Sequence, residues 1–205
     1  MTVGLLSADR FAAVASEGLG RKSSGTAGAM AYFRGGVFVA TACANPAAPD
    51  DAPRILRYDL KRGTWATVYD SPLIGPHPRA YVRDRQLGDV GTAPPQLDRR
   101  RRETGDGTRK IPRDSGYRSM CVFQGRSDER PALYVSTASR SGAILLRSAD
   151  GVSFEPVTEP GIDDPNVYSF GTLVGLNGWL FAAPAGTVTD SSLDKKIPPS
   201  AKIYA

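Results

Sequence analysis

The feature that most constrains this chain is a hairpin-like pattern that occurs three times. Each copy alternates apolar residues, places glycine where the backbone would reverse, and continues with a second apolar run. The copies are MAYFRGGVFVAT at 30–41, MCVFQG at 120–125 with LYVST at 133–137, and LVGLNGWLFAAP at 173–184. Alternation around a glycine turn predicts an antiparallel β-hairpin in each copy.

A second hairpin follows each of the first two copies, over 54–69 and 143–157. In both, a strand leads into an aspartate, a glycine and an aromatic residue: Asp59, Gly63 and Trp65, then Asp150, Gly151 and Phe154. We expect the carboxylate to accept hydrogen bonds from turn amides and the glycine to take a positive φ. We expect the aromatic ring to pack between neighbouring sheets. A third copy of this hairpin begins at 201–205.

Two successive hairpins make a four-stranded antiparallel sheet, and radial repetition of such sheets makes a β-propeller. Phe38, Tyr134 and Phe181 occupy equivalent second-strand positions, 96 and 47 residues apart. The shorter spacing suits one blade of roughly 40 to 50 residues, and the longer one suits a blade plus an insertion of similar size. The sequence therefore predicts an all-β fold of β-propeller blades, in an incomplete ring of about two and a half four-stranded antiparallel blades.

In this interpretation residues 1–205 form a single partial propeller domain. Its blades are at 29–69 and 117–158, a partial blade is at 169–205, and a basic, flexible insertion occupies 71–112. The net charge is +5, and the segment from Arg79 to Asp114 carries ten basic against six acidic residues. The basic charge thus belongs to the insertion and says little about the fold.

Two segments resemble known propeller families. SADGVSF at 148–154 resembles the Asp-box, the Ser-x-Asp-x-Gly-x-x-Trp hairpin of sialidase-like propellers, with its glycine one place early and Phe154 in place of tryptophan. YDLKRGTW at 58–65 resembles the strand–turn–strand signature of kelch and galactose-oxidase-like propellers. The resemblance covers about 25–70 and 115–205 and concerns architecture. It implies little about chemistry, because Asp-boxes lie on the propeller rim, away from the active site.

Five residues near the inner strands of the second and third copies are candidate ligand-binding residues: Asp114, Tyr117, Arg118, Asn166 and Tyr168. They lead into strands near the propeller axis, where ligands bind. The alternative is that Tyr117 and Arg118 satisfy loop carbonyls and pair with Asp114. Sialidase chemistry would need an arginine triad, but the positions aligned with Arg118 in the other copies are Gly28 and Gly171.

Metal and cofactor chemistry find little support in the composition. His77 is the only histidine, whereas a galactose-oxidase type of copper site needs at least two. Cys43 and Cys121 follow no metal or redox spacing, and we interpret them as free, buried thiols rather than a disulfide. We expect no metal and no cofactor, and the catalytic residues, if any, stay unknown.

The run Arg99–Arg102 would suit nucleic acid or an acidic partner through counter-ion release. No aromatic residue lies between Gly88 and Arg113 to stack on bases, so a solvated insertion is favoured and nucleic-acid binding is not expected. The N-terminal segment lacks a basic leader, and no stretch has the length of a membrane span. We therefore expect a cytoplasmic protein without a membrane partner.

The sequence predicts a non-enzymatic binding or scaffold propeller that recognises a protein or glycan through loops on one face. The alternative is a glycan-acting hydrolase or lyase of sialidase-like type, with catalytic residues partly outside this chain, so the enzyme question stays open. An incomplete ring leaves apolar sheet faces and strand edges uncovered. Either the chain is the N-terminal portion of a longer propeller, or copies self-associate through the open blade edges.

Overall fold

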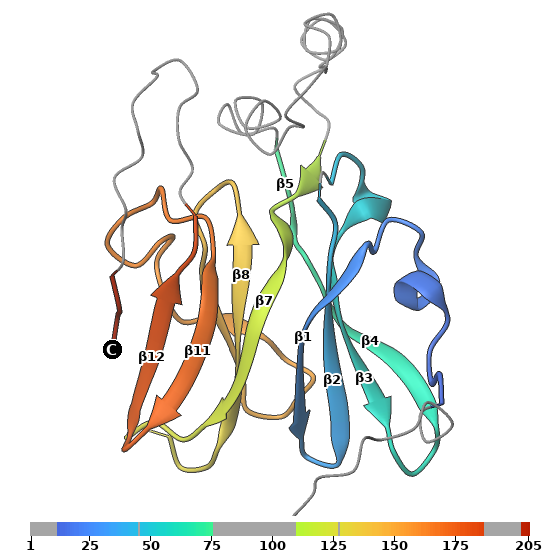
Figure 1. The fold of residues 1–205 in the computed structure, drawn as a ribbon, viewed down its shortest axis with the longest axis horizontal. Coiled ribbons are helices and arrows are strands. Elements are labelled where there is room, and N and C mark those ends of the chain that lie inside the picture. Colours follow the sequence, from blue (N-terminus) through green and yellow to red (C-terminus); the bar gives the residue numbers. More distant parts are fainter. Residues whose placement is uncertain (1–11, 45, 76–109, 127, 187–201) are drawn as a thin grey trace, which may run out of the picture.

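The computed structural model describes residues 12–44, 46–75, 110–126, 128–186 and 202–205, and its fold is all-β, as predicted (Figure 1). Two short 3-10 segments, η2 (Glu17–Gly20) and η3 (Pro49–Asp51), accompany the strands. No helix of the described residues has the length and apolarity needed to cross a membrane.

The first meander consists of four strands that pair antiparallel in chain order. They are β1 (Thr26–Phe33), β2 (Gly36–Ala42), β3 (Arg54–Asp59) and β4 (Thr64–Asp70). Arg34 and Gly35 both take positive φ between β1 and β2, which is the turn geometry that matches the twist of a two-residue hairpin.

A second meander and a third hairpin follow. The second meander is β7 (Asp114–Phe123), β8 (Ala132–Ser139), β9 (Leu145–Ser148) and β10 (Glu155–Pro156). The third hairpin is β11 (Phe170–Leu176) with β12 (Trp179–Pro184), and a bridge joins Ala182 to Tyr204. One pairing, Ala42 with Gly116, joins β2 to β7, so the two meanders form a single eight-stranded curled sheet. This curled antiparallel arrangement is consistent with a partial β-propeller-like fold.

The three copies also share their strand register. Phe38 lies opposite Ala31, Tyr134 opposite Cys121, and Phe181 opposite Val174. The first strand of each copy is bulged at the equivalent residue, which is Gly28, Arg118 and Gly171 in turn. A β-bulge bends its strand and re-aims the local side chain, so the repeat extends to strand curvature.

Two apolar clusters hold the three units side by side, in the order that Figure 1 shows. The first cluster lies between the meanders and contains Phe38 and Ile55 against Leu133 and Val135. The second lies between the second meander and the third hairpin, where Tyr134 meets residues of β11 and β12. Fully burying a side chain such as Phe38 contributes about 2 kcal/mol, so these clusters dominate the stability of the stack.

The turn chemistry of the second hairpins follows the prediction. Asp59 Oδ1 accepts hydrogen bonds from the Lys61 and Arg62 amides, and Asp150 Oδ1 accepts them from the Val152 and Ser153 amides. Gly63 and Gly151 take φ of 65° and 80°. These carboxylates cap turns because they reach the amides two and three residues further along.

The two aromatic residues of these hairpins differ. Phe154 packs across the meanders on Tyr69, with 5.5 Å between ring centroids, as predicted. The prediction for Trp65 was wrong, because its ring stacks 4.9 Å from Tyr58 within its own meander, on the face turned away from the second one. No sheet of the described residues covers that face, so the tryptophan has no neighbouring sheet to pack against.

Part of the predicted organisation lies outside the described residues. The insertion predicted at 71–112 falls largely in 76–109, which includes His77 and Arg99–Arg102. Its two ends pair as β5 (Leu73–Ile74) and β6 (Ile111–Pro112). Cys43 and Cys121 are not joined in a disulfide, as predicted, but each is only partly buried and not buried as expected.

Candidate functional site

Asp114 lies at the start of β7 and is 1% exposed. Its carboxylate receives a hydrogen bond from the Ser71 hydroxyl (3.0 Å) and pairs with the Arg113 guanidinium at 2.5 Å. Arg113 in turn donates to the Gly142 carbonyl oxygen. Burial raises the pKa of Asp114, and the neighbouring Arg113 and Ser71 partly oppose that shift. These contacts tie β7 to the segment that follows β4, which is a structural arrangement.

Tyr117 belongs to the core between the two meanders and is fully buried. Its ring meets Tyr69 edge-on at 6.2 Å. Burial raises the pKa of Tyr117 well above 10, and it raises that of Tyr69 to about 12. The Tyr117 hydroxyl has no hydrogen-bond partner among the residues that the structure describes. A buried hydroxyl without a partner is uncommon, because its desolvation is not compensated.

The other predicted residues are spread over the surface and the interior. Tyr168 is buried, and its hydroxyl shares a hydrogen bond of 2.5 Å with the Ser115 hydroxyl. Asn166 is exposed in a loop, where its side-chain amide donates to the Asp164 carboxylate. Asp114 and Tyr117 are therefore both buried where β7 meets the end of the first meander, whereas Asn166 is at the surface. Their role in ligand binding stays a prediction.

Arg118 is exposed and forms no hydrogen bond or ion pair with any described residue. It is the bulged residue of β7, and its counterparts in β1 and β11 are glycines. A Cβ atom added at Gly28 would lie 2.3 Å from the Tyr117 carbonyl oxygen, so only glycine fits at this position. Within the described residues the repeat thus presents one arginine at this position and not a ring of them.

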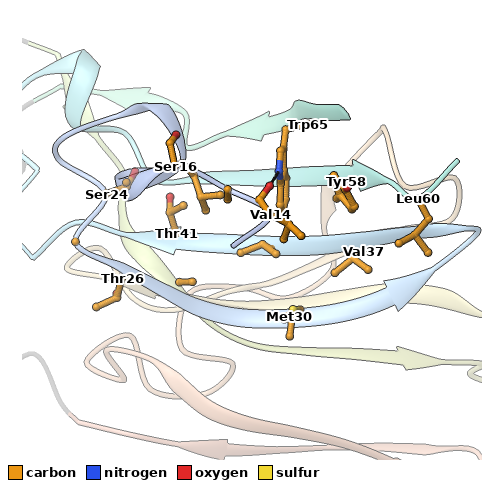
Figure 2. A pocket seen from close by; sticks show the side chains of 16 residues that line it. Val14, Ser16, Ser24, Thr26, Met30, Val37, Thr41, Tyr58, Leu60 and Trp65 are labelled. Atoms are coloured by element: carbon orange, nitrogen blue, oxygen red, sulfur yellow. Dashed lines mark hydrogen bonds between the residues drawn. The ribbon is translucent and has the colours of Figure 1, made fainter. Parts of the chain in front are cut away.

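An apolar groove occupies the face of the first meander that carries Trp65 (Figure 2). Its volume is about 570 Å³. We define the groove face by five side chains of the first meander: Met30, Val37, Tyr58, Leu60 and Trp65. None of the five predicted ligand residues lines this groove.

Strand alternation creates the groove face. Alternate side chains of β1, β2 and β3, such as Ala31, Phe38 and Ile55, point into the cluster shared with the second meander. Residues of the opposite face, such as Met30, Val37 and Tyr58, line the groove. Met30 is 68% exposed although it lies within a strand, and Tyr32 and Leu60 are exposed as well. A contiguous exposed apolar surface of this kind marks an interaction site.

The N-terminal segment forms the opposite rim of the groove. The Trp65 indole donates a hydrogen bond of 2.8 Å to the Val14 carbonyl oxygen, as Figure 2 shows. Arg54, which is buried, donates to the Leu19 carbonyl oxygen, and desolvation lowers the pKa of its guanidinium. These two bonds hold the rim over the sheet and leave the space between them open.

Sequence reasoning missed this groove. Its one signal was Trp65, a residue expected between sheets that had no preceding sheet to meet. The rim could not be inferred, because it depends on contacts between residues far apart in the sequence, such as Val14 and Trp65.

Comparison with known proteins finds no family model, no curated protein and no solved structure that matches this chain. The functional assignment therefore depends on the geometry alone.

Proposed function

We propose that this chain is a non-enzymatic binding or scaffold module of the β-propeller type, and that the apolar groove is its binding surface. The groove is the observation that carries the proposal. Ligand sites in proteins are mainly apolar clefts of roughly 300 to 1,000 Å³ with a few polar groups, and this groove falls within that range. The hydroxyls of Ser16, Ser24 and Tyr58 supply polar groups at its edge.

The hairpin geometry supports the propeller part of the proposal. The Asp-box-like segment has the Gly151 amide donating to the Ser148 hydroxyl, beside the two amides that bond to Asp150. The kelch-like segment closes its hairpin with Tyr58 on Trp65. Both arrangements are local, and repeated hairpins of this kind suit blades whose surfaces bind partners.

A fluorescent dye for apolar surfaces, anilinonaphthalene sulfonate, tests the groove. We expect protein too dilute to self-associate to bind the dye, and Met30→Glu to weaken that binding about tenfold, because a charge in the groove costs more than 1 kcal/mol of apolar contact. Val152→Glu is the matched control, since Val152 is similarly exposed but lies in the turn before β10. Equal dye affinity of the two variants would contradict the proposal.

A further inference from the structure

We propose that two copies of this chain associate head to tail, each placing the outer face of its third hairpin on the groove face of the other. Val174, Leu176, Trp179 and Phe181 make up this outer face, and the Arg126 guanidinium lies over the Trp179 ring, 4.7 Å from its centroid. The inference rests on the proposed function, because it names the partner of the same groove.

The first support is an aromatic residue of the second strand that packs each unit against the next one along the chain. Phe38 of β2 points into the cluster shared with the second meander. Tyr134, at the same register position in β8, points into the cluster shared with the third hairpin. Phe181 holds that position in β12, opposite Val174, but lies in neither cluster and is only partly buried. In each internal contact, one unit supplies the aromatic side chain (the donor half) and the next unit receives it (the receiving half). The outer face of the third hairpin therefore corresponds to the donor half of a contact that the chain makes twice.

The second support is the residue that receives each contact. Met120 lies opposite Val135 and packs against the cluster that holds Phe38. Leu173 lies opposite Ala182 and is buried in the cluster that holds Tyr134. Met30 has the same position in β1, opposite Val39, yet it is 68% exposed. Among the described residues only the N-terminal segment, at Val14 and Leu19, reaches the groove face, and it leaves Met30 uncovered. The groove face therefore corresponds to the receiving half of the same contact.

The two end faces of the chain correspond to opposite halves of the same repeated contact. One chain has an unmatched donor face, where Val174 is 50% exposed, and an unmatched receiving face around Met30. A second copy would supply the missing half at both ends, with an aromatic residue and an aliphatic residue at the register positions of the internal contacts. Two copies together contain four meanders and two partial units, about five blades, within the four to eight blades of closed propellers. Closure gives a two-fold dimer, because each end face is used once in each copy.

Sedimentation velocity tests the dimer directly. We expect wild-type protein to sediment at twice the chain mass of 21.8 kDa. Met30→Glu and Val174→Glu, placed on opposite end faces, should each sediment as the monomer, whereas Val152→Glu should remain dimeric. Both changes are at exposed positions, and a cooperative thermal unfolding transition of each monomeric variant confirms that it folds. Leu60→Glu and Leu176→Glu, which change exposed side chains on the two faces, repeat the test if one variant misfolds.

Mixing the two monomeric variants distinguishes this mode from a symmetric contact. In the mixture the outer face of Met30→Glu still matches the groove of Val174→Glu, so one of the two contacts survives. We expect a species at twice the chain mass in the mixture and none in either variant alone. A mixture that stays monomeric, or a wild-type protein that is monomeric at all concentrations, would overturn the proposal.

The dye separates failure of this proposal from failure of the proposed function. A dimer covers its grooves, so Val174→Glu should bind more dye than wild type does. A monomeric wild type whose dye binding still depends on Met30 would leave the groove as a binding site for another partner. In Val174→Glu, whose groove is open, dye binding that stays unchanged when Met30→Glu is added would remove the proposed function itself.

Discussion

The Tyr117 hydroxyl is a polar group in an apolar core, and its removal has a definite expected effect. An unsatisfied buried hydroxyl costs roughly 1 to 3 kcal/mol. Since this hydroxyl has no partner among the described residues, we expect Tyr117→Phe to raise the free energy of unfolding by about 1 kcal/mol. Urea unfolding followed by circular dichroism measures the change.

Tyr168→Phe is the matched control. Its hydroxyl bonds to Ser115, so the same chemical change should lower the free energy of unfolding by about 1 kcal/mol. If Tyr117→Phe were destabilising to a similar degree, the Tyr117 hydroxyl would have a hydrogen-bond partner in the folded protein.

Single residues could be predicted where their partners are close in sequence. The carboxylates of Asp59 and Asp150 cap turns within three residues, and sequence alone placed them correctly. The burial of Asp114 and Tyr117 depends on Ser71 and Tyr69, which are more than forty residues earlier. Such distant contacts leave no local sequence signal, so these two residues looked like candidates for ligand binding.

At the scale of strands, the close approach of β1 and β7 depends on Gly28. A Cβ atom there would lie 2.3 Å from the Tyr117 carbonyl oxygen, which belongs to a backbone that cannot move aside cheaply. We expect Gly28→Ala to lower the free energy of unfolding by about 2 kcal/mol or more, as overpacking does. Thermal unfolding of the variant measures this loss.

Gly25→Ala provides the comparison for this strand. Gly25 lies just before β1, and a Cβ atom there would have its nearest contact at 3.9 Å, an ordinary van der Waals distance. We expect a change of less than about 0.5 kcal/mol in its free energy of unfolding. Equal effects of the two substitutions would mean that β1 and β7 can separate without loss.

The strand pairs were the most predictable elements. Period-two alternation and glycine turns mark hairpins locally, and the equivalence of Phe38, Tyr134 and Phe181 reappears as a shared register. The bulges at Gly28, Arg118 and Gly171 were not predicted, because the residues around these positions differ between the three copies and share no local bulge signal. Trp65 was misplaced for a related reason, since a local pattern does not say whether a neighbouring sheet exists.

At the scale of the whole molecule, the stack of units was predictable from the sequence, but the position of the N-terminal segment over one end of it was not. Repetition of one hairpin pattern indicated units packed side by side, with uncovered faces at both ends. The path of the N-terminal segment over one end is fixed by two long-range bonds, from Trp65 to Val14 and from Arg54 to Leu19. The groove exists only because this segment stands beside the sheet without filling the space above Met30.

Global stability should depend on pH through two aspartates with opposite shifts. Burial raises the pKa of Asp114 above its usual 3.8, so the folded state holds its proton more tightly than the unfolded state. The stability that this proton contributes is present below 3.8 and is lost as pH rises through the raised pKa. Hydrogen bonds from the Ser153 and Val152 amides lower the pKa of Asp150 to about 2. Its contribution is present above 3.8 and is lost as pH falls toward about 2.

The free energy of unfolding should decline as the pH rises above about 4, and we expect Asp114→Asn to make this decline shallower. The loss of stability at acidic pH, which comes from Asp150, should remain in this variant. Asp150→Asn should weaken the acid loss and leave the decline toward neutral pH unchanged. Urea unfolding of dilute protein at a series of pH values measures both slopes. An unchanged neutral slope in Asp114→Asn would mean that this carboxylate is ionised in both states and that Arg113 outweighs burial. Because Asp114 bonds to Ser71 and Asp150 caps a single turn, the two slopes report on different contacts of the same stack.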